Sequence, residues 1–152
     1  MKTLFFFCTV CFIAVFELSA QTYEVKVITS VESVVPAGLG RSRLIDANEV
    51  RDYNEYTTTR TDESKNRNKS DRGEIRLKNF DETKLLNFYN VGGIRFQNIA
   101  ANDAVIESKI NAMLAEGWDL AFVTSAVESD AGQRDGNGIF ITRFIFRRPI
   151  NP

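Results

Sequence analysis

Alternating apolar and polar residues mark the first extended part of the chain. In "YEVKVI", which starts at Tyr23, tyrosine and valine alternate with glutamate and lysine, the two-residue period of a strand with one face mostly in water. The pattern runs to Val35, "PAGLG" follows as a turn, and "RSRLI" resumes an extended pattern. We therefore predict a long hairpin from Tyr23 to Ile45.

A helical period comes later in the chain. Asn102 or Asp103 can cap a helix whose apolar positions recur every three or four residues. These positions are Val105, Ile106, Ile110, Met113 and Leu114, and the polar side of the same helix carries Glu107, Ser108, Asn111 and Glu116.

The stretch "LAEGWDLAFV" reads as the end of that helix and the start of a strand. Gly117 stands one residue past the helix, where a left-handed backbone suits glycine. Trp118 then folds back onto the last turn as a core residue, and apolar alternation resumes beyond Asp119. We expect Asp119 to be a cross-strand partner of Arg143 or Lys26.

The last strand, "IFITRFIFRRP", is apolar on both faces. Three phenylalanines, Phe140, Phe144 and Phe146, share one side, and the other carries Ile139, Ile141 and Ile145 with Arg143 among them. Such a strand belongs in the middle of a sheet with both sides covered. The helix covers one face, so the other needs either the chain between hairpin and helix or a second copy of the protein.

The middle of the chain supplies both a loop and a candidate for that second layer. Residues 51–73 lose the apolar pattern, which predicts a mobile polar loop. "EIRLKNF" alternates again, and "KLLNFY" fits either a strand or a short helix before "VGG" interrupts it. We expect Glu74–Phe96 to complete the second layer, which predicts a monomer.

These elements predict one α+β domain over residues 21–152, an antiparallel sheet of about four to six strands with one main helix on a face. Residues 1–20 stand apart. A basic start, an apolar run from Leu4 to Phe16 and a small residue at Ala20 are typical of a signal peptide. Cleavage near Ala20 predicts a secreted or periplasmic protein without a transmembrane segment, and removes Cys8 and Cys11.

Composition narrows the possible chemistry. The net charge of −1 gives no electrostatic reason to expect nucleic acid as a partner. With no histidine anywhere and no cysteine after residue 20, the mature chain lacks the usual ligands of zinc, copper and haem and the commonest general base. We therefore expect no cofactor, no metal and no catalytic residue, and a binding or interaction module rather than an enzyme. A hydrolase that uses carboxylates alone is the alternative.

Several of these segments resemble a known family. "KINAMLAEGWDLAFV", then "FITRFIFRRP", together with the opening "YEVKVI", is similar to the small bacterial domain-of-unknown-function family numbered 4177. Its members have a glutamate where this chain has Asp119, and they lack the long middle segment. The signal ending "LSAQ" also resembles secreted proteins of Bacteroidota. The family has no assigned activity, so the resemblance implies a fold and no function.

Three short motifs could form a binding or modification site. "SDAGQRDGNG" has the composition of a calcium loop but not the ligand spacing of an EF-hand, so a hairpin connection is the better interpretation. "NKS" at Asn68 matches a glycosylation acceptor. "PAGLGRSR" places Gly38 and Gly40 beside Arg41 and Arg43, where backbone N–H groups and guanidinium groups could bind a phosphate or carboxylate. The expected partner is thus a small anionic ligand or an unknown protein.

Overall fold

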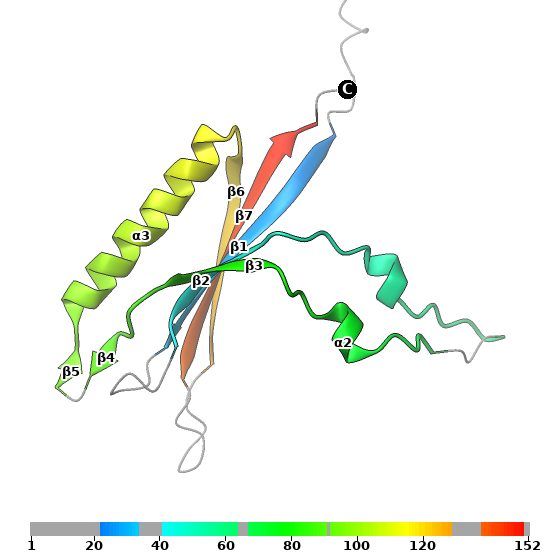
Figure 1. The fold of residues 1–152 in the computed structure, drawn as a ribbon, viewed down its shortest axis with the longest axis horizontal. Coiled ribbons are helices and arrows are strands. Elements are labelled where there is room, and N and C mark those ends of the chain that lie inside the picture. Colours follow the sequence, from blue (N-terminus) through cyan, green and yellow to red (C-terminus); the bar gives the residue numbers. More distant parts are fainter. Residues whose placement is uncertain (1–21, 34–40, 64–66, 91, 129–137, 151–152) are drawn as a thin grey trace, which may run out of the picture.

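The computed structural model describes residues 22–33, 41–63, 67–90, 92–128 and 138–150 (Figure 1). These residues form an α+β fold, as predicted, with a five-stranded antiparallel sheet in the order β3-β2-β1-β7-β6. The strands are β1 (Tyr23–Ser33), β2 (Arg43–Ala47), β3 (Phe80–Lys84), β6 (Asp119–Glu128) and β7 (Ile139–Pro149). A two-stranded sheet joins β4 (Tyr89–Asn90) to β5 (Gly93–Ile94), and the helices are η2 (Tyr53–Tyr56), α2 (Arg72–Ile75) and α3 (Phe96–Ala115).

The predicted hairpin is confirmed in β1 and β2, which pair antiparallel, although its turn lies outside the described residues. The strand β1 also pairs along its full length with β7, from Tyr23 opposite Pro149 to Ser33 opposite Ile139. The first and last strands of the described chain therefore form the centre of the sheet.

The main helix begins earlier than the sequence pattern predicts. It starts at Phe96, and neither Asn102 nor Asp103 caps it. Asn102 is instead buried, with 1% of its surface exposed, because its side chain bonds the backbone of Leu86. A capping residue and a residue that binds a neighbouring chain segment have the same side-chain chemistry, and the sequence pattern did not separate the two roles.

One side of α3 packs on the sheet. Met113 is buried, and Val105, Ile106 and Ile110 contact the core as predicted, whereas Leu114 is 47% exposed and does not belong to it. The polar positions Glu107, Ser108, Asn111 and Glu116 are exposed. The buried core consists of Ile28, Leu44, Leu85, Met113, Trp118 and Phe146.

The helix ends as the sequence predicts. Gly117 has a positive φ of 84°, its N–H donates to the carbonyl of Leu114, and the N–H of Trp118 donates to that of Met113. This pair of hydrogen bonds is a Schellman motif. Trp118 is 8% exposed, and the Arg148 guanidinium lies 4.4 Å from its ring centroid. Gly117 and Trp118 thus have a structural role at the end of the helix.

The central strand, β1, turns toward the helix the face that the sequence pattern predicts to lie in water. Ile28 points toward α3, which turns Val25 and Val27 to the other side, where they are 63% and 42% exposed. Lys26 lies on the helix side and its Nζ is 2.9 Å from Asp46 Oδ1, while Lys109 of α3 contacts Asp46 Oδ2 at 2.8 Å. Charge pairing therefore allows polar residues to lie between helix and sheet.

The middle of the chain does not complete a second layer, which corrects our expectation for Glu74–Phe96. Leu85 is buried on the helix side of the sheet, and Ile75 and Leu86 are 47% and 41% exposed. Residues 48–63 and 67–79, here called the arm, extend from the sheet on the side opposite to α3 (Figure 1). The predicted strand "EIRLKNF" is also wrong, because Ile75 ends the short helix α2. The prediction of a monomer depended on that second layer and is left without support.

No described segment of the chain covers the other face of the sheet, which is consequently open. Side chains alternate along a strand, so the residues out of phase with Ile28, Leu44 and Phe146 point away from α3. We call this surface the open face; its apolar members are Val25, Val27, Val31, Ile45, Ala47, Phe80, Phe122, Ala126, Ile139, Ile141 and Ile145.

The helix end gives a first prediction. Gly117→Ala should destabilise the fold by about 1 kcal/mol, because alanine resists a left-handed backbone. Trp118→Ala should cost about 3 to 5 kcal/mol, because a large buried ring is lost. Urea unfolding of both variants measures these differences; a Trp118→Ala chain as stable as the wild type would contradict the packing described for this ring.

The arm gives a second prediction. Arg60, Arg67, Lys69 and Arg72 are all exposed, so trypsin should cleave there before it cleaves the sheet, and the remaining domain should stay folded. Mass spectrometry of a digestion time course identifies the first bonds cut. First cleavage within β1, β7 or α3 would show that the arm is protected.

Candidate functional site

Two of the four predicted anion-binding residues lie at a hollow in the described structure. Arg41 immediately precedes β2 and Arg43 is its first residue, and both line the hollow. Gly38 and Gly40 lie outside the described residues. The hollow therefore contains the guanidinium half of the predicted site.

The hollow has a volume of about 470 Å³ and a strongly basic lining. Its cations are Arg41, Arg43 and Lys84, and no carboxylate is among the lining residues that the structure describes. The rest of the lining comprises Ser42, Leu85, Leu86, Asn87, Tyr89, Asn90 and Asn98. Cationic groups next to amides and a phenol suit a ligand that carries negative charge and hydrogen-bonding groups.

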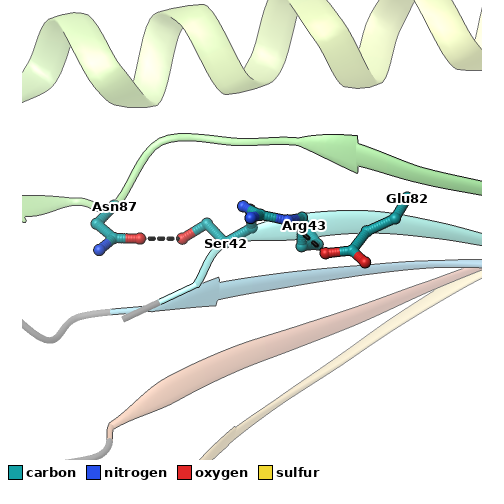
Figure 2. A network of polar contacts seen from close by, with 4 residues as sticks. All are labelled: Ser42, Arg43, Glu82 and Asn87. Carbon is teal, nitrogen blue, oxygen red and sulfur yellow. Dashed lines mark hydrogen bonds and ion pairs between the residues drawn. The ribbon is translucent and has the colours of Figure 1, made fainter. Parts of the chain in front are cut away.

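A chain of hydrogen bonds fixes one side of the hollow. Ser42 Oγ donates to Asn87 Oδ1 at 2.7 Å (Figure 2) and accepts from the N–H of Ser33 at 2.9 Å. Asn98 of α3 then donates from Nδ2 to the carbonyl oxygen of Asn87 at 2.8 Å. These bonds join the hairpin, the segment after β3 and the helix, so three parts of the chain hold Asn87 in place.

The three cations differ in how far they are already paired. Arg43 donates from Nε to Glu82 Oε1 at 2.5 Å and from Nη1 to the carbonyl oxygen of Ser42 at 2.7 Å (Figure 2). Arg41 and Lys84 have no acidic partner among the described residues. Arg43 is thus held in position, whereas Arg41 and Lys84 keep their charge for a ligand.

Sequence reasoning missed most of the remaining lining. Lys84, Asn87, Asn90 and Asn98 lie around the segment for which the sequence fitted both strand and helix. A sequence feature that could have indicated these amides is the repeated asparagine after the leucine pair, in "KLLNFYN". Without the position of this segment beside β2, nothing connected those amides with Arg41.

The segment that forms this side of the hollow is anchored by Asn102. Its Oδ1 accepts from the N–H of Leu86 at 2.7 Å, and its Nδ2 donates to the Leu86 carbonyl oxygen at 2.8 Å. The same Nδ2 donates to Glu32 Oε1 at 2.8 Å. Every polar atom of this buried amide is thus used, and we call this arrangement the Asn102 clamp.

The clamp has an electrostatic consequence at Glu32. Burial raises the pKa of the Glu32 carboxyl above its ordinary value; the bond from Asn102 opposes this shift and the nearby charge of Asp103 adds to it. Glu32 is not among the residues lining the hollow. Its perturbed pKa therefore belongs to the packing of the clamp against β1.

The other described residues singled out in the sequence lie away from the hollow. Asp119 stands opposite Arg147 in the register of β6 and β7, which corrects the expected partners Arg143 and Lys26. Asn68 of the glycosylation-type motif donates from Nδ2 to the carbonyl oxygen of Glu55 within the arm. The calcium-like loop falls outside the described residues, apart from its last glycine, Gly138.

Comparisons with family models, with curated proteins and with solved structures found no match to this chain. The resemblance to the domain-of-unknown-function family 4177 stays a prediction. No helix among the described residues is both long and apolar enough to span a membrane.

The raised pKa of Glu32 gives a third prediction. Above about 4.3, the ordinary glutamate pKa, the unfolded chain releases this proton more readily than the folded one. Ionisation of Glu32 therefore removes stability as the pH rises through its raised pKa. Glu32→Gln keeps an oxygen that accepts from Asn102 and avoids this loss. The melting temperature of the variant should exceed that of the wild type at neutral pH and approach it below the ordinary pKa.

A matched control is Glu107→Gln, which removes an exposed carboxyl from α3 and should leave the difference near zero at every pH. Thermal melts across the acidic range measure both variants. If Glu32→Gln were less stable than the wild type at neutral pH, the assigned sign would be wrong.

Proposed function

We propose that this protein is an exported, non-catalytic module that binds a small anionic ligand in the hollow beside Arg41 and Lys84. One observation carries the proposal. Two cationic side chains without an acidic partner among the described residues border a hollow whose polar wall is already hydrogen-bonded in place. Such a site is preorganised, so a ligand loses little free energy to ordering its walls.

The lining supports an oxyanion as the charged part of the ligand. A guanidinium binds two oxygens of a phosphate or carboxylate side by side, and an ammonium adds a point charge. Asn90 uses its Oδ1 to accept from the N–H of Gly92, which leaves its amide N–H groups directed to other acceptors. Leu85, Leu86 and Tyr89 add apolar surface, which suits a ligand with a small organic body.

The absence of a carboxylate from the described lining favours binding over hydrolysis. A hydrolase based on carboxylates needs an acid and a base or nucleophile on opposite sides of the scissile bond. Glu82, the acid that contacts the lining residue Arg43, is paired with that arginine. Export is supported by the apolar run and the small residue at the start of the sequence.

Calorimetric titration tests the proposal with inorganic phosphate, pyrophosphate and citrate as probes. We expect at least one probe to bind, more weakly as salt increases. Arg41→Ala and Lys84→Ala should each weaken binding about tenfold or more, because a hydrogen bond between charged groups contributes about 1.5 to 3 kcal/mol.

Arg60→Ala is the matched control, since it removes an exposed arginine from the arm and should not change the affinity. Equal losses in all three variants would mean that the net charge and not the hollow attracts the anion. No heat of binding from any probe at millimolar concentration would contradict the proposed function.

A further inference from the structure

The open face of the sheet is apolar where an exposed face is normally polar. A row of apolar residues crosses all five strands and consists of Phe80, Ala47, Val27, Ile145 and Phe122. Phe122 is 61% exposed and Phe80 is 43% exposed. An antiparallel sheet with one face in water usually places polar residues there, and a continuous apolar surface marks an interface.

The size of this face matches what a pair of identical chains needs. The strands are 11, 11, 10, 5 and 5 residues long. At about 3.3 Å per residue and about 4.8 Å between strands, they cover roughly 650 Å² in projection. Two such faces packed together bury about 1300 Å², within the range of about 1200 to 2000 Å² for stable complexes.

This face carries charges of both signs, so that two copies need not repel each other. Its basic residues are Arg43, Lys84, Arg143 and Arg147, and its acidic residues are Glu82, Asp119 and Glu128. Arg43 already pairs with Glu82, and Arg147 stands opposite Asp119. A face with both signs and an apolar row is complementary to itself, as a two-fold interface requires.

Arg143 indicates how the two copies are oriented relative to each other. It lies near the middle of the open face and has no acidic partner among the described residues. In the register, Arg143 stands beside Thr29, and Glu82 lies in the same row on the other side of β1. A two-fold axis parallel to β1 exchanges these sides, and it brings Glu82 of a second copy near Arg143. Burial of the arginine is then offset by an opposite charge.

The arm adds apolar surface on the same side of the sheet. It extends away from α3 (Figure 1), and its Val50 and Tyr53 are 95% and 73% exposed. A small ligand on the sheet would not reach these side chains. A second folded copy lying on the open face would be bordered by the arm.

We propose that the open face is the surface through which two copies of this chain pack face to face as a symmetric sandwich. Sheets in such a sandwich lie about 10 Å apart and cross at about 30°. The interface shares Arg43 and Lys84 with the lining of the proposed anion site, whereas Val25 and Val27 do not line the hollow, so substitutions at the two valines test the interface alone.

Analytical ultracentrifugation of the mature chain over a range of micromolar concentrations tests the proposal. We expect a dimer in the wild type, and at least about a tenfold weaker dimer in Val25→Lys and Val27→Lys, since each lysine places a charge in the apolar interface. Both positions are exposed in the single chain, so the substitutions should leave the circular dichroism melt unchanged in dilute protein, where the wild type is also monomeric.

Val123→Lys is the matched control. Val123 lies on the helix side of β6, opposite Phe144, and is 45% exposed, so this variant should remain a dimer. A wild-type chain that stays monomeric, or a dimer that Val25→Lys and Val27→Lys leave intact, would overturn the proposal.

Discussion

The packing of a single helix on a single face of the sheet determines the rest of this structure. α3 covers the side of the sheet that carries Ile28 of β1 and Phe146 of β7. The same side carries Lys26, so the interface has to accommodate charge, and it does so through Asp46, which binds Lys26 and Lys109. The more regular apolar side of β1 is left uncovered by any described segment. One orientation thus accounts for both the ion pairs of the buried Asp46 with two half-buried lysines and the open face.

The proposed anion site depends on that packing through the Asn102 clamp. Asn102 lies on the buried side of α3 and bonds both backbone groups of Leu86. The clamp places the next residue, Asn87, against Ser42, and so forms the wall of the hollow opposite Arg41. A buried amide with all its hydrogen bonds made restricts the segment strongly, because any displacement leaves polar groups without partners.

Local features of the fold could be predicted from the sequence, whereas relations between distant segments could not. The end of α3 followed from Gly117 and Trp118, because the capping chemistry involves adjacent residues. The residues on each face of β7 were assigned correctly from the two-residue alternation of a strand. The orientation of β1 was wrong, because burial of Lys26 depends on Asp46 in another strand. Of the candidate site, Arg41 and Arg43 were found, while Lys84 and the asparagines required the position of their segment in space.

The orientation of the sheet is the central claim, and the rate of thiol labelling tests it most directly. The two natural cysteines, Cys8 and Cys11, precede Gln21, so a chain that begins there can carry one cysteine at Val25 or at Ile28. We predict that the thiol at Ile28 is protected at every protein concentration. The thiol at Val25 should react quickly in dilute protein and become protected as the concentration rises. A reactive thiol at Ile28, together with one at Val25 that stays protected on dilution, would contradict the account.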